Sequence, residues 1–140
     1  VVVADKQSKA ELVQYCLEQH FMKDASHLVV VCSDLEEVQR LYGDLANRYG
    51  SQQAGAAIQS MLLQATELDI ASCWIGSFDE EPIKPLLSIP DNVRVEAVIA
   101  FGHSTKRKWE VPPKFWLNKA VYFEAYGKPL GFKERAEQAW

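Results

Sequence analysis

One segment of the chain, residues 51–68, is apolar around most of the helix that its spacing predicts. The main stripe recurs at intervals of three and four residues and comprises Ala54, Ile58, Met61, Leu62, Ala65 and Leu68. The small residues 55–57 and Leu63 extend the apolar surface around the cylinder. Since a helix of this kind is buried on several sides, we expect a long, buried central helix. A subunit interface is the second role open to it, and we predict a homodimer because an apolar face of this size would otherwise lie exposed.

Three apolar runs predict the strands of a sheet. Residues 27–32 (HLVVVC) are continuously apolar, which is typical of a strand buried on both faces. Residues 1–4 form a short β-branched run, and residues 93–101 alternate before they become apolar on both faces. Strands and helices follow one another without strict βαβ repetition, so we predict a single α+β domain over residues 1–140.

Two capping boxes predict further helices. Ser8 and Glu11 begin a helix that runs to about His20, and Ser33 and Glu36 begin one that runs to about Arg48. Gly50 is expected to close the second helix.

The stretch LDIASCWIGSFDEE, residues 68–81, raises the main functional question. From the residues alone, it is a Gly76-Ser77 turn between two helices, with Trp74 as core filler. The acidic residues 79–81 favour the start of the next helix, which ends near Leu87, over a carboxylate acid–base pair. Motifs that define common nucleotide sites, metalloproteases and serine hydrolases do not occur in the sequence.

Charge and cysteine content narrow the class of protein. The chain has 15 basic and 19 acidic residues and a net charge of −4, whereas nucleic-acid-binding domains usually carry a basic excess. The basic run at 106–108 is a solvated loop or, as the alternative, a local anion site. No apolar run is long enough to span a membrane.

An odd set of three cysteines without a CxxC pair predicts reduced, buried thiols in a cytoplasmic protein: Cys16, Cys32 and Cys73. We expect structural roles, and no metal, for the three dispersed histidines.

Several segments together resemble the nitroreductase-like flavoproteins. The resemblance lies in AGAAIQSMLLQATELDIASCWIGSFDEEPIKPLL at 54–87 and VRVEAVIAFGHS at 93–104. The segments KDASHLVVVCSD at 23–34 and PPKFWLNKAVYFEAYG at 112–127 also match the family in order and spacing.

The resemblance implies a fold, a cofactor and an activity. The implied fold has a central mixed sheet flanked by helices and forms an obligate homodimer with FMN in clefts built by both subunits. Hydride would pass from NAD(P)H through the flavin to nitroaromatic, quinone or similar acceptors, so the cofactor carries the chemistry and no side chain is assigned a catalytic role. The implied cofactor-binding residues are Ile75, Gly76, Ser77, Lys114 and Arg107.

In this scheme the backbone is the functional part of residues 68–81. The amides of Gly76 and Ser77 would point at N5 and O4 of the flavin ring, where donors stabilise negative charge. Ile75 and Trp74 would pack beneath and hold the turn. Lys114 would contact the FMN phosphate, with Arg107 and Lys108 as weaker candidates.

The chain also departs from the family pattern. The family's Arg-Ser-x-Arg phosphate segment does not occur, and the chain begins with Val1 inside a strand pattern, so we expect residues missing in front. Asp69 and Ala71 replace common glycines, and Gln53 replaces a common acidic residue. The alternative hypothesis is therefore a shortened, non-catalytic relative that acts as a flavin-binding or dimeric scaffold module.

Overall fold

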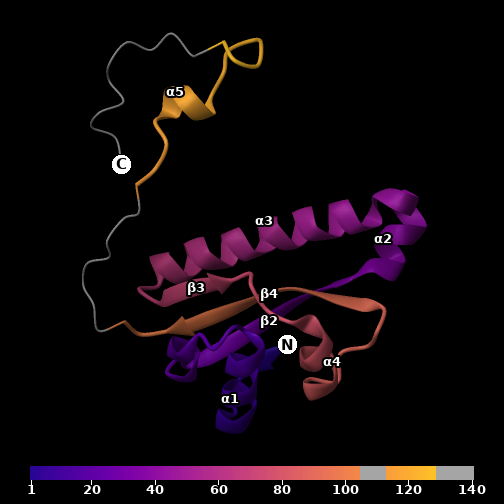
Figure 1. The fold of residues 1–140 in the computed structure, drawn as a ribbon, viewed down its shortest axis with the longest axis vertical. Coiled ribbons are helices and arrows are strands. Elements are labelled where there is room, and N and C mark those ends of the chain that lie inside the picture. The colour runs from indigo at the N-terminus through magenta and orange to yellow at the C-terminus, as the bar shows by residue number, and fades with distance from the viewer. Residues whose placement is uncertain (105–112, 129–140) are drawn as a thin grey trace. The chain divides into compact units, whose positions relative to one another are not determined.

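The structure is a computed structural model that describes residues 1–104 and 113–128. The chain divides into two compact units, Val1–Thr105 and Lys106–Trp140, and each is described by itself. The first unit contains a four-stranded sheet and its helices (Figure 1). The second contains the short helix α5, Leu117–Ala120, and a ring contact between Tyr122 and Tyr126 at 4.8 Å.

The sheet is formed by four strands in the order β1-β2-β4-β3. Their bounds are β1 Val2–Val3, β2 His27–Asp34, β3 Ala71–Ile75 and β4 Val93–Gly102. All three pairings of these strands are antiparallel. The predicted α+β class is confirmed, but within the described residues the sheet is antiparallel rather than mixed.

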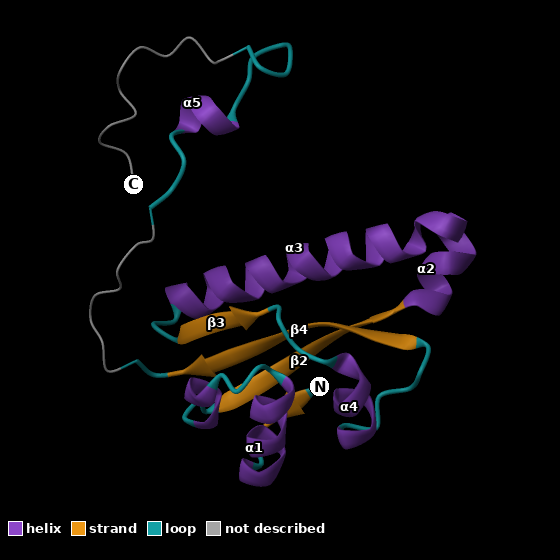
Figure 2. Cartoon of the chain, in the orientation of Figure 1, coloured by secondary structure: helices purple, strands orange, loops and turns teal. Residues whose placement is uncertain are grey.

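The helices cover both faces of this sheet (Figure 2). One face carries α1 (Lys6–Tyr15), the 3₁₀ helix η1 (His20–Lys23) and α4 (Glu80–Leu86). The other face carries the long helix α3, Ala46–Glu67, which follows α2 (Leu35–Tyr42) and η2 (Gly43–Leu45).

Two clusters of buried side chains correspond to these two faces. The larger cluster joins α1, α4 and the sheet and includes Leu12, Val13, Leu28, Val30, Ile75, Ile83 and Val98. The smaller cluster lies beneath α3 and consists of Ile58, Ala97 and Ile99, with Met61 and Leu62 packed against it. β2 and β4 contribute to both clusters. The middle of β4 is buried on both faces, as its apolar run predicts, whereas β2 is buried toward the larger cluster and half-buried toward α3.

Helix α3 is longer than predicted and is buried on one face in the single chain. It begins at Ala46 and passes through Gly50, so Gly50 does not close the preceding helix. That role belongs to Gly43, which follows α2 with a φ of 54°. The outward residues of α3 are exposed, including Leu63 at 62%, whereas the sequence predicts that this helix is buried on several sides.

The helix starts also differ from the predicted capping boxes. Asp5 caps α1 and accepts a hydrogen bond from the Ser8 amide at 2.8 Å. Asp34 caps α2 and accepts one from the Glu36 amide at 3.1 Å. In both places an aspartate carboxylate takes the capping position that the S-x-x-E pattern predicts for serine.

Candidate functional site

The candidate site begins at the end of a strand. The sequence pattern predicts only a turn between two helices in this part of the chain. Residues Ala71–Ile75 form β3, which pairs with β4 from Ala71↔Gly102 to Ile75↔Val98. Side chains of a strand alternate between its faces. Ile75 accordingly packs in the larger cluster with 1% exposure, and Trp74, 43% exposed, points to the side of α3. The burial of Ile75 agrees with its predicted packing beneath the turn, whereas Trp74, which is predicted to pack there with it or to fill the core, is exposed. The sequence also does not predict the strand itself.

Gly76 and Ser77 follow β3 and are exposed. Within residues 1–104 and 113–128, no hydrogen bond is made by either backbone N–H. A Cβ built on Gly76 meets nothing closer than Trp74 Nε1 at 3.8 Å, and the φ of Gly76 is not in the left-handed region. Two unpartnered donors therefore lie at an open backbone surface. Such a surface can take a flat ring with acceptor atoms at its edge, as in the FMN that the family resemblance implies.

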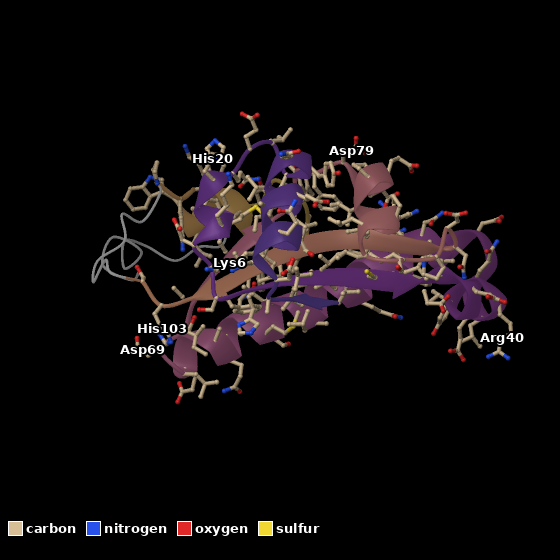
Figure 3. The ribbon with its side chains drawn as sticks, turned by 90° about the horizontal axis from the view of Figure 1, so that it is seen from below. Lys6, His20, Arg40, Asp69, Asp79 and His103 are labelled. Carbon is tan, nitrogen blue, oxygen red and sulfur yellow. The ribbon has the colours of Figure 1, made fainter. Side chains whose placement is uncertain are left out.

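The far end of this loop is fixed by contacts of Asp79. Its carboxylate accepts from the Glu81 amide at 3.2 Å and caps α4. Its own amide donates to the carbonyl of Tyr15 at 2.8 Å, at the end of α1. Phe78 packs against the larger cluster between these anchors. Figure 3 labels Asp79 at the start of α4. The loop is thus held between a buried strand residue and a capped helix.

The acidic residues 79–81 have the helix-start role that the sequence predicts. Glu80 and Glu81 occupy the first turn of α4. Glu80 Oε2 also accepts from the Val95 amide at 3.0 Å, and Glu80 Oε1 lies 3.8 Å from Lys84 Nζ. The Asp79 carboxylate therefore caps α4, and the Glu80 carboxylate joins α4 to β4.

Two of the predicted cofactor-binding residues, Lys114 and Arg107, belong to the second unit. Lys114 is exposed in the second unit, and Arg107 lies outside the described residues, as does Lys108. Their predicted contacts with the FMN phosphate stay predictions.

The thiols and histidines form no reactive cluster in the described part of the chain. All three cysteines are unpaired, but only Cys16 is buried; Cys32 is half-buried and Cys73 is exposed, contrary to the prediction of three buried thiols. Burial raises the pKa of Cys16 to about 11. No three His, Cys, Asp or Glu side chains of the described residues are grouped so that they could hold a metal ion. In Figure 3, His20 and His103 are well separated.

None of the described helices is long and apolar enough to cross a membrane.

The chain is similar in sequence to known proteins. A 15.4 kDa protein of Mycolicibacterium smegmatis is 36% identical over 80 residues, which cover 56% of this chain and 50% of the relative. An NADPH-flavin oxidoreductase of Vibrio harveyi is 24% identical over 134 residues, which cover 90% of this chain and 55% of the relative. The chain therefore spans about half the length of these curated relatives.

Solved structures show the same fold. The NADPH:FMN oxidoreductase from Vibrio harveyi complexed with NAD⁺ superposes with a TM-score of 0.79 at 24% identity, over 91% of this chain and 59% of that one. An FMN-dependent nitroreductase from Clostridium difficile R20291 gives a TM-score of 0.72 at 26% identity, over 90% and 74% of the two chains. The family model described as "Nitroreductase family" matches residues 2–103. With that match across the sheet, both helical layers and the Gly76-Ser77 loop, the chain belongs to the nitroreductase family.

Proposed function

We propose that this chain is an FMN-dependent NAD(P)H oxidoreductase that delivers hydride to nitroaromatic, quinone or similar acceptors. The observation that carries the proposal is the pair of exposed amides at Gly76 and Ser77, directly after β3, which have no hydrogen-bond partner among the described residues. Relatives named as NADPH-flavin oxidoreductase and FMN-dependent nitroreductase support the same class of reaction.

The role of the loop is to present fixed donors. Bound FMN would supply the two-electron chemistry that side chains lack. The amides of Gly76 and Ser77 would donate to the N5 and O4 edge of the ring, where negative charge grows on reduction. Because Gly76 has no side chain, the ring can approach the backbone closely. The buried Ile75 and the capped start of α4 keep these donors in place before the ligand arrives.

The phosphate end of the cofactor needs a cation. We assign it to Lys114, with Arg107 as the second candidate, because a charge-assisted contact to a phosphate oxygen is stronger than a neutral one. Loss of FMN affinity in Lys114→Ala that exceeds the loss in Lys119→Ala would support this assignment. Equal affinities in the two variants would remove it.

We further propose that the chain works as a homodimer. The outward face of α3 and the turn after it leave Leu63 and Leu68 62% and 60% exposed, and large exposed apolar patches mark interaction surfaces. Sedimentation should give a dimer at micromolar concentration. A stable monomer there would contradict the proposal.

The unpaired cysteines suit a reducing compartment, and we propose the cytoplasm.

The first experiment is an absorption spectrum of the purified protein, followed by titration with FMN. A flavin spectrum at about one per subunit, with NAD(P)H-dependent bleaching, is the expected result. A protein that stays colourless after added FMN would overturn the oxidoreductase proposal. If that colourless protein were dimeric, the non-catalytic scaffold would become the better description.

A further inference from the structure

The indole of Trp74 lies between helix α3 and the Gly76-Ser77 loop. Its Cη2 atom is 3.8 Å from the position of a Cβ built on Gly55 of α3, and its Nε1 atom is 3.8 Å from that of a Cβ built on Gly76. One edge of the ring therefore meets the helix backbone, and the polar edge meets the loop. Figure 1 shows β3, which carries Trp74, directly beneath α3.

This polar edge has no partner in the described part of the chain. No hydrogen bond from Trp74 Nε1 is found there, and the side chain is 43% exposed. Tryptophan combines a large apolar body with one N–H donor, which usually finds an acceptor when it is covered. Three unpartnered donors thus neighbour one another: the Gly76 amide, the Ser77 amide and the Trp74 indole N–H.

The backbone around Trp74 limits where the indole can move. Trp74 is paired with Ile99 of β4, and its neighbour Ile75 is fixed in the core. The glycine at position 55 leaves room for the ring against α3, since an added Cβ would already be in van der Waals contact with it. The indole therefore borders the loop on one side, and the backbone of Trp74 is held by the sheet.

We propose that Trp74 is a further ligand-contacting residue of this site. Its ring lies beside the flat heterocycle held by Gly76 and Ser77, and its Nε1–H donates to an acceptor at the edge of that heterocycle. This inference rests on the proposed FMN function, and it adds a side-chain donor to a site otherwise made of backbone.

The test is an FMN titration of the ¹⁵N-labelled protein followed through its indole N–H resonances. The chain has four tryptophans, and the Trp74 resonance is assigned by its loss in Trp74→Phe. If that variant does not fold, replacing Trp109, Trp116 and Trp140 assigns the same resonance by elimination. We expect the Trp74 resonance to shift as FMN is added. The dissociation constant obtained from this shift should equal the one measured from flavin fluorescence. An unmoved Trp74 resonance at saturating FMN would overturn the inference while leaving the FMN proposal intact.

A matched pair of variants gives an independent measure. Trp74→Phe keeps an aromatic ring and removes the donor, so FMN affinity should fall about 3- to 10-fold, as expected for one lost hydrogen bond. Phe21→Leu, at a residue of similar exposure (47%) in η1 on the other face of the sheet, should bind FMN like the wild type. Equal affinities in Trp74→Phe and the wild type would contradict the inference. If the wild type binds no FMN at all, the proposed function fails and this inference fails with it.

Discussion

The amide of Asp79 donates to the carbonyl of Tyr15 at 2.8 Å, which joins the start of α4 to the end of α1. On the other side of the loop, β3 ends at the buried Ile75. The Gly76-Ser77 amides therefore lie in a short segment that is fixed at both ends. Donors that are already in place cost little reorganisation when charge develops on a bound ring.

Replacing Gly76 by valine should reduce FMN binding without harming the fold. An added Cβ would make ordinary van der Waals contact with Trp74 Nε1 at 3.8 Å, and the backbone conformation suits an L-residue. Stability should thus change by only about 0.5 kcal/mol. FMN affinity, measured by flavin fluorescence, should fall more than about 10-fold because the branched side chain occupies the place of the ring.

Two substitutions at the next residue distinguish backbone from side-chain donors. Ser77→Ala keeps the amide and should bind FMN like the wild type, whereas Ser77→Pro removes the N–H and should weaken binding. Equal FMN affinity in Gly76→Val and the wild type would mean that residues 76–77 are only a connection between β3 and α4.

A buried carboxylate supports the start of α3. The register between β2 and β4 shifts from Val31↔Ala97 to Cys32↔Val95, so Glu96 is the extra residue of a β-bulge in β4. Its side chain is 8% exposed; one oxygen accepts from Ser51 Oγ at 3.0 Å, and the other lies 4.0 Å from Arg94 Nε. Among the described residues, that second oxygen has no hydrogen-bond partner.

Ser51→Ala should therefore destabilise the protein by roughly 1.5–3 kcal/mol, because it removes a hydrogen bond to a buried charge. Urea unfolding at fixed protein concentration measures this. Ser60→Ala is the control: Ser60 is exposed on the same helix and bonds only its own helix backbone, at Ala56 O. A free energy of unfolding equally reduced in both variants would contradict the role of the Ser51–Glu96 contact.

The sequence predicts most elements because their signals are local. The apolar runs of β2 and β4 and the acidic start of α4 correspond directly to observed elements. The strand β3 was missed because its five residues, ASCWI, carry no clear alternation. It is a strand because β4 lies beside it, about 25 residues further along the chain, and local patterns do not contain that pairing.

The glycines illustrate the same limit. Both Gly43 and Gly50 are plausible helix ends by composition, and only the packing distinguishes them. Gly50 is buried within α3 where Leu35 and Ser33 approach it, so its small size serves close contact. For the site, the sequence and the family resemblance together predict Gly76 and Ser77. The anchoring of their loop by Tyr15 depends on a contact across 64 positions and could not be predicted from either.

This packing predicts different responses to alanine at two glycines of α3. A Cβ at Gly55 would make ordinary contact with Trp74, so Gly55→Ala should stabilise the helix by about 0.5–1 kcal/mol. A Cβ at Gly50 would lie 2.8 Å from Leu35 Cδ2, so Gly50→Ala must displace that side chain and should gain less or lose stability. Thermal unfolding of the two variants under one set of conditions compares them. A more stable Gly50→Ala than Gly55→Ala would contradict the packing at Gly50.

The buried thiol of Cys16 predicts how stability depends on alkaline pH. Burial raises its pKa from 9.0 to about 11, because the charged thiolate loses its hydration in the core. Between pH 9 and 11 the unfolded chain releases this proton and the folded chain keeps it. The unfolded state then binds fewer protons, so stability falls as pH rises. The contribution of this thiol to that fall is roughly 2–3 kcal/mol.

Chemical denaturation at pH 8, 9, 10 and 11 would measure this loss. Cys16→Ala should be less stable at pH 8, because it leaves a small cavity, yet its stability should fall less steeply above pH 9. Cys73→Ala is the control: burial also raises the pKa of Cys73, but this side chain is exposed, so its removal should change the slope less than Cys16→Ala does. Thiol labelling at pH 8 gives an independent check: Cys73 should react in the folded protein and Cys16 only after unfolding. Parallel stability curves for Cys16→Ala and the wild type would show that another group governs the alkaline transition.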